Sequence, residues 1–215
     1  MVTLTKELQD SLTPSKALEF LKEGNTRFVN NLKVNRNLLQ QANETKDGQH
    51  PFAVVLSCID SRTSAELIFD LGLGDIFSVR IAGNVINDDI LGSMEFGCKV
   101  SGAKIIVVLG HTKCGAVKGA CDHVEMGHLT DLLNKIRPAV EEETTVLDNR
   151  NSANENFVEK VSEINVKRTV KAILERSLIL RQMIDNGEIG IVGGIHDITT
   201  GKVEFLPETM ISVVD

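Results

Sequence analysis

Two short segments of the chain carry the side chains best suited to bind a metal ion. Cys58 follows the apolar run 52–56, and His111 and Cys114 follow the apolar run 105–109. Continuous runs of valine, isoleucine and leucine are typical of strands buried on both faces of a parallel sheet. Because functional groups gather outside the carboxyl ends of such strands, two neighbouring strands would bring two thiols and one imidazole together. Two sulfur ligands, one nitrogen ligand and an open fourth position are typical of catalytic zinc. The spacing therefore predicts that Cys58, His111 and Cys114 bind Zn²⁺.

The joint placement of these three side chains favours metal binding over ordinary packing. A single buried cysteine usually packs as a small apolar side chain. We expect that role for Cys98, on the apolar side of a predicted helix, and for Cys121, near a helix end. A helix beginning near Cys114 would in contrast lower the pKa of that thiol and favour the thiolate.

Asp60 and Arg62 are the second informative pair, because they follow Cys58 in the same loop. Their spacing predicts a charge-assisted ion pair. An exposed pair of this kind contributes little to stability, but beside a metal it acquires a function. Asp60 would be the fourth ligand in a closed state, whereas Arg62 would hold it away and leave room for water. A zinc ion with two thiolates and a neutral imidazole is formally uncharged, so we expect an alkaline activity optimum.

The elements that must position these residues alternate along the chain, which predicts an α/β fold. We expect a mostly parallel central sheet of four parallel strands plus an antiparallel edge strand, flanked by helices. The expected strands are 52–56, 76–79, 105–109, 189–194 and 203–205, and the expected helices are 14–32, 64–71, 88–101 and 157–186. Residues 33–50 and 122–156 are polar and are expected to be surface passages.

The N-terminal helix begins with Thr13 as its cap and Pro14 in its first turn. We expect this helix to pack on a partner subunit. The whole chain, 1–215, is expected to be one domain, with an N-terminal helical arm at 1–50 and a zinc-binding α/β core at 51–215.

Composition excludes several classes of protein. The 215 residues suit one α/β domain, and the net charge of −7 disfavours binding to nucleic acid. The longest apolar runs are far shorter than the roughly 18 residues of a membrane helix, so no membrane span is expected. Residues 1–7 lack the layout of a secretory signal, and four cysteines favour reduced thiols. The expected location is cytoplasmic.

Cys-x-Asp-Ser-Arg at 58–62, followed by His-x-x-Cys at 111–114, resembles the β-class carbonic anhydrases. The resemblance covers most of the chain, from the segment 21–28 to the segment 197–205. It implies that Cys58, His111 and Cys114 are the ligands of one Zn²⁺ per subunit. It also implies that Asp60 and Arg62 form the catalytic dyad of the family.

The same resemblance implies a substrate pocket. Gln49 matches a glutamine that donates a hydrogen bond to bound substrate, and Gly115 matches a glycine whose N–H faces it. Phe77 matches an aromatic wall contributed across a dimer interface. Phe96 stands where many members carry tyrosine, and Ala82 where plant-type members carry valine. Some members bind a second bicarbonate with a Trp–Arg–Tyr set; this chain has neither tryptophan nor tyrosine, so only its Arg80 matches.

The implied reaction is reversible hydration of carbon dioxide to bicarbonate by zinc-bound hydroxide, with His50 and His196 as candidate proton acceptors. The implied assembly is a homodimer or a dimer-based tetramer. One alternative is hydrolysis of carbonyl sulfide or carbon disulfide at the same site. Another is a zinc-stabilised structural protein whose fourth metal position is permanently filled by Asp60.

Overall fold

The computed structural model describes residues 3–213 and contains one five-stranded sheet. The strand order is β2-β1-β3-β4-β5, in which the first four strands are parallel and the last is antiparallel to its neighbour. This arrangement confirms the predicted fold class. The strands are β1 (Ala53–Ser57), β2 (Ile76–Arg80), β3 (Ile105–His111), β4 (Gly190–His196) and β5 (Val203–Ile211).

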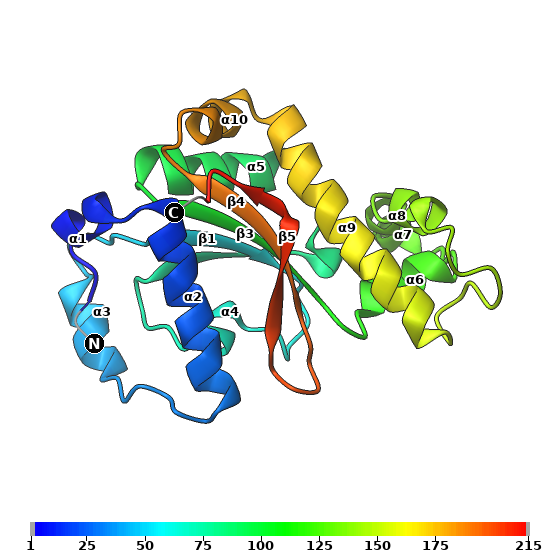
Figure 1. Cartoon of the computed structure of the whole chain (residues 1–215), viewed down its shortest axis with the longest axis horizontal. Helices are drawn as coiled ribbons and strands as arrows, with labels where there is room; N and C mark the ends of the chain where they lie inside the picture. The colour runs from blue at the N-terminus through cyan, green and yellow to red at the C-terminus, as the bar shows by residue number, and fades with distance from the viewer. Residues whose placement is uncertain (1–2, 214–215) are drawn as a thin grey trace.

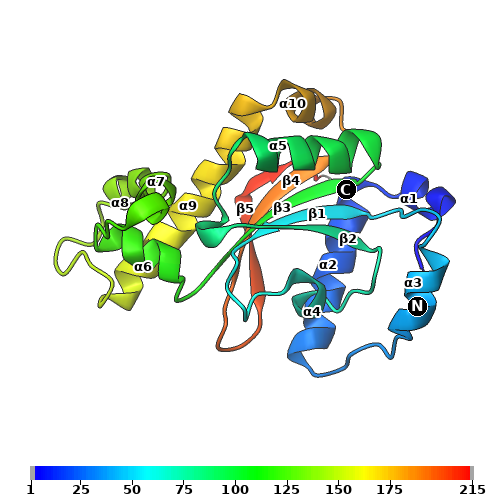
Figure 2. The ribbon, with the colours of Figure 1, turned by 180° about the vertical axis from the view of Figure 1, so that it is seen from behind.

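Helices cover both faces of the sheet, as Figures 1 and 2 show from opposite sides. Helices α2 (Pro14–Val29) and α4 (Ala65–Ile68) lie on one face, and α5 (Asp88–Glu95), α9 (Glu155–Arg176) and α10 (Leu178–Asp185) lie on the other. Alternate residues of each buried strand enter the two resulting cores, so that Val54 packs on the α5 side and Val55 on the α2 side. Strands covered on both faces need continuous apolar runs, which is the pattern of β1 and β3.

The N-terminal region contains two helices that were not predicted. Thr13 caps α2, and its hydroxyl accepts a hydrogen bond from the Lys16 N–H, as predicted. An additional helix, α3 (Leu38–Glu44), lies inside the expected surface passage 33–50. It begins there because the Asn37 side chain accepts a hydrogen bond from the Gln40 N–H. A short helix, α1 (Lys6–Ser11), precedes α2.

Helix α2 packs on the sheet of its own chain through Ala17, Leu18 and Leu21, which belong to the same core as Val55. The packing of this helix on a partner subunit therefore concerns its other faces and stays a prediction. The division into an arm at 1–50 and a core at 51–215 stays a prediction as well.

The predicted helix 157–186 is wrong in its continuity, because two helices occupy this segment. Ser177 adopts an extended conformation between α9 and α10. Its hydroxyl accepts a hydrogen bond from the Leu180 N–H and donates one to Glu95 Oε1 on α5. The break therefore has a cap of its own and a contact across the fold.

The predicted polar excursion 122–156 contains helices, which corrects that expectation. Helices α7 (Gly127–Asn134) and α8 (Arg137–Glu142) pack with α6 (Gly115–Cys121) against the N-terminal half of α9. They form a helical cluster that projects from one end of the sheet (Figure 1). Two other predicted helices differ in detail: 64–71 shortens to α4, and 88–101 becomes α5 followed by a π-helical turn at 96–100.

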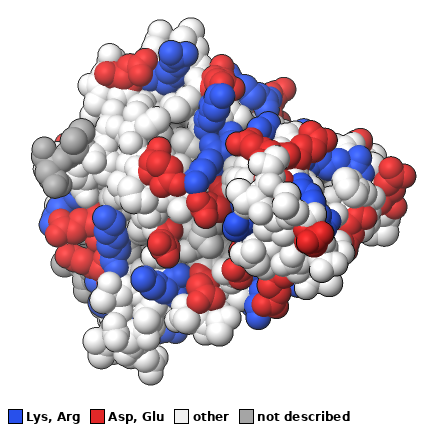
Figure 3. Space-filling model, turned by 45° about the vertical axis from the view of Figure 1, so that its right-hand side comes forward, with Lys and Arg blue, Asp and Glu red and all other residues white. Residues whose placement is uncertain are grey.

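Acidic and basic side chains alternate over the face shown in Figure 3, which presents no large patch of either sign. In the described part of the chain, no helix combines the length and the hydropathy needed to cross a membrane.

Candidate metal centre

The carboxyl edge of the sheet brings Cys58, His111 and Cys114 together. Cys58 follows the last residue of β1, His111 ends β3, and Cys114 is the N-cap of α6. The Cys58 and Cys114 Sγ atoms lie 3.9 Å apart, and one potential ligand atom from each of the three residues lies within 4.8 Å of the others. All three side chains are buried. The predicted trio thus forms one cluster.

The donor set fits zinc. Two thiolates bound to one tetrahedral Zn²⁺ at about 2.3 Å would lie about 3.8 Å apart, close to the separation found here. The His111 Nδ1 atom lies 2.9 Å from the Thr112 carbonyl oxygen, to which its N–H donates. This bond leaves the lone pair on Nε2, which is buried and has no hydrogen-bond partner among the described residues. An imidazole nitrogen held in this way beside two sulfurs is suited to a metal ion.

The two thiols interact strongly, and their pKa values move in opposite directions. The pKa of Cys58 is lowered, because Cys114 above all, and also the Gly83 N–H, stabilise its thiolate. The pKa of Cys114 is raised by the neighbouring Cys58 and by burial. This result contradicts the expected lowering of the Cys114 pKa, because the N–H groups at the start of α6 are outweighed by the adjacent sulfur. Ionisation of Cys114 beside the Cys58 thiolate is favoured when a cation neutralises the pair.

Gly83 supplies a backbone hydrogen bond to the Cys58 sulfur. Its N–H donates to Cys58 Sγ at 3.4 Å, from a 3₁₀ turn (Ala82–Asn84) that follows β2. Gly83 has a φ of +69°, and an added Cβ would lie 2.5 Å from Ile136 Cδ1. Only glycine fits this conformation and this close approach.

Asp60 and Arg62 form the predicted ion pair in a bidentate geometry. Arg62 Nε donates to Asp60 Oδ1 at 2.9 Å, and Arg62 Nη2 donates to Oδ2 at 2.7 Å. The Arg62 backbone N–H also donates to Asp60 Oδ1. The Arg62 side chain holds the pKa of the Asp60 carboxyl well below its usual range. The carboxylate is thus engaged by Arg62, and the cluster of potential ligand atoms found in residues 3–213 does not include it.

Arg80 fixes the loop that connects Cys58 to Asp60. Its Nε donates to the Cys58 carbonyl oxygen at 3.0 Å, and its Nη2 donates to the Asp60 carbonyl oxygen at 2.7 Å. Sequence reasoning missed this role and considered Arg80 only in relation to a second bicarbonate site. The available signal was its place at the end of β2, which aligns Arg80 with Ser57 in the neighbouring strand.

The five predicted pocket residues divide into two groups, those near the three potential metal ligands and those far from them. Ala82 lies beside Gly83, and Gly115 is the first residue of α6, so both lie next to the metal-binding side chains. Gln49 precedes β1 and therefore lies at the amino end of the sheet. Because the five residues of β1 span about 16 Å, Gln49 lies far from Cys58 of its own chain.

The two predicted aromatic residues belong to the second group. Phe77 aligns with Val54 near the amino end of β1, and its ring lies 6.2 Å from that of Phe96 in an edge-to-face arrangement. Phe96 is 53% exposed. A single chain therefore brings Phe77 and Phe96 together but does not bring them to the cysteines.

The two histidines considered as proton acceptors have different environments. His196 ends β4 and aligns with His111, and burial lowers its pKa to about 4. It is neutral at physiological pH, and neither ring nitrogen has a hydrogen-bond partner within residues 3–213. His50 lies at the amino end of the sheet with Gln49. Cys98 and Cys121 are buried in apolar cores, as predicted.

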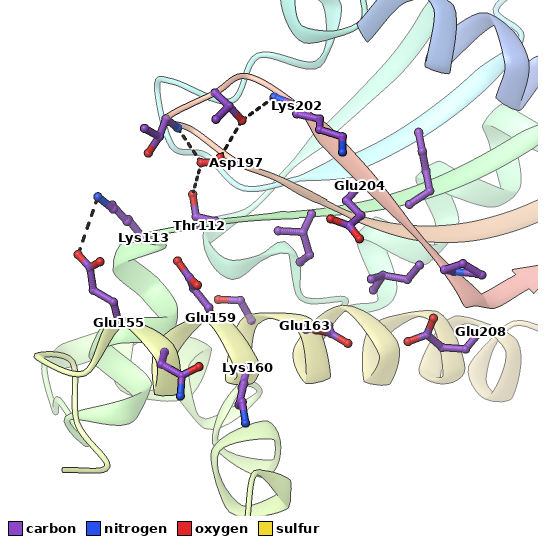
Figure 4. A pocket seen from close by; sticks show the side chains of 18 residues that line it. Thr112, Lys113, Glu155, Glu159, Lys160, Glu163, Asp197, Lys202, Glu204 and Glu208 are labelled. Carbon is purple, nitrogen blue, oxygen red and sulfur yellow. Dashed lines mark hydrogen bonds and ion pairs between the residues drawn. The ribbon is translucent and has the colours of Figure 1, made fainter. Parts of the chain in front are cut away.

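A groove with a volume of about 820 Å³ lies beside the metal-binding loop, defined as residues 111–114, between α9 and the β4–β5 hairpin (Figure 4). Thr112 and Lys113 line it, but none of the three potential metal ligands does. The Thr112 hydroxyl lies 3.5 Å from Asp197 Oδ1, and Lys113 pairs with Glu155 at 3.8 Å. The groove thus adjoins the back of the metal-binding loop and is separate from the metal-binding side chains.

Sequence comparisons identify relatives along nearly the whole chain. The family model of carbonic anhydrase matches residues 53–203. Carbonic anhydrase 2 of Mycobacterium tuberculosis is 35% identical over 201 residues, which cover 88% of this chain and 91% of that protein. A carbonic anhydrase of Mycolicibacterium smegmatis is 37% identical over 193 residues, covering 89% of this chain and 92% of that protein.

Solved structures give the same result. The β-carbonic anhydrase CafA of Aspergillus fumigatus superposes with a TM-score of 0.69 and 29% identity, and the match covers 90% of each chain. A tetrameric β-carbonic anhydrase of Sordaria macrospora, at 23% identity and a TM-score of 0.68, shares the fold, with 78% of this chain and 90% of that chain covered.

Proposed function

The chain belongs to the β-carbonic anhydrase family, and on this basis we propose that it binds one Zn²⁺ through Cys58, His111 and Cys114 and catalyses the reversible hydration of carbon dioxide to bicarbonate. Family membership implies the reaction, and the cluster of two thiols and one imidazole is compatible with zinc. The single observation that carries the proposal is the buried, unpartnered Nε2 of His111 beside two sulfurs 3.9 Å apart. Zinc, when bound, would supply a Lewis acid that makes hydroxide available from water at mildly alkaline pH.

Asp60 and Arg62 are proposed to control the fourth position of the metal. Both oxygens of Asp60 accept hydrogen bonds from Arg62, so the carboxylate is held away from the cysteines and the position is open to water. In this position the Asp60 carboxylate accepts a hydrogen bond from the O–H of the attacking water and thereby orients the water. If released by Arg62, Asp60 would be the residue that holds the fourth position of the metal and closes the site. Arg80 supports the switch by fixing the backbone of the loop.

The substrate pocket is proposed to form between two subunits of a homodimer or a dimer-based tetramer. Ala82 and the Gly115 N–H come from the chain that binds the metal. Gln49 and the aromatic wall of Phe77 and Phe96 come from the partner, since they lie at the opposite end of the sheet in their own chain. In this arrangement Gln49 and the Gly115 N–H stabilise the charge that develops on the substrate oxygen.

Complementation tests the shared pocket. Gln49→Ala and Cys58→Ser homodimers should each lose at least about 100-fold in CO2 hydration, because each lacks an oxyanion donor or the metal. Mixed dimers restore one intact site, made of Cys58 from one chain and Gln49 from the other. Activity that rises on mixing supports the shared pocket, and activity that stays at the level of the homodimers contradicts it.

The proposed reaction is tested by measuring zinc content, CO2 hydration and carbonyl sulfide hydrolysis on one preparation. We expect one zinc per chain and faster turnover of CO2. Faster turnover of carbonyl sulfide would replace the proposed reaction with its closest alternative. A zinc-loaded protein that is inactive on both substrates would indicate a structural zinc site closed by Asp60.

A cytoplasmic location is part of the proposal and is supported by the free thiol state of Cys58, Cys98, Cys114 and Cys121.

A further inference from the structure

One turn of α9 contacts two segments that adjoin the potential metal ligands: the residue before His111 and the turn that donates to Cys58. Helix α9 lies between the sheet and the cluster of α6 to α8 (Figure 1). Val166 fits against Gly110, the residue before His111, so closely that an added Cβ at Gly110 would lie 2.7 Å from Val166 Cγ2. Gly193 of β4 makes a similar approach to Val166. The two glycines therefore let α9 approach the sheet at the level of the metal-binding residues.

Asn165, the neighbour of Val166, contacts the second of these two segments. It is 3% exposed, and its Nδ2 donates a hydrogen bond of 2.9 Å to the Gly83 carbonyl oxygen. The N–H of the same Gly83 donates to Cys58 Sγ at 3.4 Å. A side chain of α9 is therefore connected to a metal-binding sulfur through a single residue.

An asparagine at position 165 lowers the stability of the helix, so packing alone does not explain its presence there. Asparagine is a weak helix former, and a buried amide is unfavourable unless it is hydrogen-bonded. Glycine adopts its positive φ here without strain but is also free to leave it, so an external hydrogen bond is needed to fix the turn in one conformation. The Asn165 amide supplies that support at the carbonyl side of the turn.

We propose that Asn165 is a positioning residue for the metal-binding thiolate of Cys58, acting through the Gly83 backbone. By holding the Gly83 carbonyl, Asn165 keeps the Gly83 N–H directed at Cys58 Sγ. This N–H withdraws electron density from the sulfur and fixes its direction, as outer hydrogen bonds do for metal ligands in general. The inference rests on the proposed metal site and adds to it a residue that lies outside the sequence motifs.

The test uses the whole chain loaded with Co²⁺ in place of Zn²⁺, because thiolate-to-cobalt absorption reports the electron density on the sulfurs. Asn165→Asp keeps the size of the side chain but cannot donate from a carboxylate, and Asn165→Leu removes all polar atoms. Both should move the charge-transfer band to longer wavelength and lower the zinc affinity, measured against a chelator, about tenfold. Thr169→Val is the matched control, because Thr169 lies one turn later on α9, is 5% exposed and makes no hydrogen bond to residues 82–84 of the described chain.

Thermal unfolding separates positioning from simple support of the fold. Each Asn165 variant should lose more stability in the zinc-bound form than in the metal-free form, whereas Thr169→Val should lose the same amount in both. An unshifted cobalt band in both variants, or equal losses with and without zinc, would overturn the inference. Failure of both variants to fold, while Thr169→Val folds, would assign Asn165 to the core and overturn it too. A native chain that binds neither metal would instead defeat the proposed function, so the two failures are distinguishable.

Discussion

Two buried polar clusters in this chain differ in how their hydrogen-bonding groups are satisfied. Asp70 lies just after α4, where Arg27 Nε donates to its Oδ2 and Arg36 Nη1 donates to its Oδ1, each at 2.6 Å. The Val34 N–H adds contacts to both oxygens. At the carboxyl edge of the sheet, His111 Nε2 and both nitrogens of His196 are buried without partners in the described residues.

The difference separates structure from function. The Asp70 carboxylate is satisfied entirely by its own chain, which is how a buried charge stabilises a fold. At the carboxyl edge of the sheet, the buried nitrogens of His111 and His196 have no partner among the described residues, which lowers the stability of the fold. These nitrogens are available to a bound group. Substitutions in the first cluster should therefore affect stability, and those in the second should affect chemistry.

His111→Ala should produce the largest effect, a fall in CO2 hydration of at least about 1,000-fold, or about 4 kcal/mol, because the metal is lost. The metal-free variant should lie within about 1 kcal/mol of the metal-free parent, because removal of the unpartnered nitrogen offsets part of the lost packing and of the lost bond to the Thr112 carbonyl oxygen. Stopped-flow hydration and chemical unfolding measure the two quantities. His128→Ala is the control, because His128 is exposed on α7 and lies outside the proposed site. A metal-free variant that is about 2 kcal/mol less stable than the metal-free parent would contradict the contrast between the Asp70 cluster and the sheet edge.

Asp70→Asn should lower the free energy of unfolding by about 3 kcal/mol, because two guanidinium groups lose their counter-charge. The folded fraction should keep its zinc content and its CO2 hydration rate. Asp10→Asn is the control, since Asp10 is an exposed partner of Lys6 and should change stability by less than about 0.5 kcal/mol. Loss of zinc from folded Asp70→Asn would show that the two clusters are coupled.

Arg62→Ala should lower CO2 hydration by about 10- to 100-fold, up to about 2.7 kcal/mol, while zinc stays bound. The reason is that Asp60 loses the bidentate partner that holds it away from the metal. Stability should change little, because the Arg62 side chain is 54% exposed. Arg62→Lys keeps the charge but not the planar fork, so its rate should be intermediate. Unchanged hydration in Arg62→Ala would remove the proposed control of the fourth position.

The stability of the parent should fall in acid with a contribution from Asp70. Burial raises the pKa of this carboxyl, but the hydrogen bonds from Arg27, Arg36 and the Val34 N–H outweigh burial and leave the pKa below its usual 3.8. The folded form therefore binds the proton less readily than the unfolded form. Its contribution is present above about pH 4 and is lost as the pH falls further. Unfolding measured against pH should lose this component in Asp70→Asn, and identical acid profiles would contradict it.

Lys113→Gly should have the smallest effect, a rise in unfolding free energy of about 0.5 kcal/mol. Lys113 has a φ of +57° between His111 and Cys114, and glycine adopts that conformation without strain. Within the described residues, the only ion pair of Lys113 is its long contact with Glu155. Chemical unfolding measures the change, and Lys118→Gly, in the interior of α6, should instead be destabilising. A loss of stability in Lys113→Gly would indicate that its side chain matters more than its backbone.

The parts of the fold that could be predicted depend on local patterns. The apolar runs before Cys58 and His111 predict buried parallel strands, and the ends of those strands predict where the side chains meet. The cap at Thr13 likewise fixes the start of α2 from neighbouring residues alone.

The parts that could not be predicted depend on contacts between distant segments. The break at Ser177 involves Glu95 on α5, which no pattern within 157–186 reveals. Arg80 and Asn165 act on backbone carbonyls of other segments, so their roles become visible only in the folded chain. The pKa of Cys114 was predicted with the wrong sign, because the effect of Cys58 depends on a sulfur–sulfur distance. Gln49 and Phe77 lie at the opposite end of the sheet from Cys58, so their predicted place in the pocket depends on the proposed second subunit.

Zinc stoichiometry and CO2 hydration, measured side by side on the parent chain and on Cys114→Ser, test most directly whether the cluster at the sheet edge is a metal centre. One zinc per parent chain with rapid hydration, and loss of both in the folded variant, is the predicted result. A parent that is isolated without metal, or a variant that keeps both its zinc and its hydration rate, would contradict it.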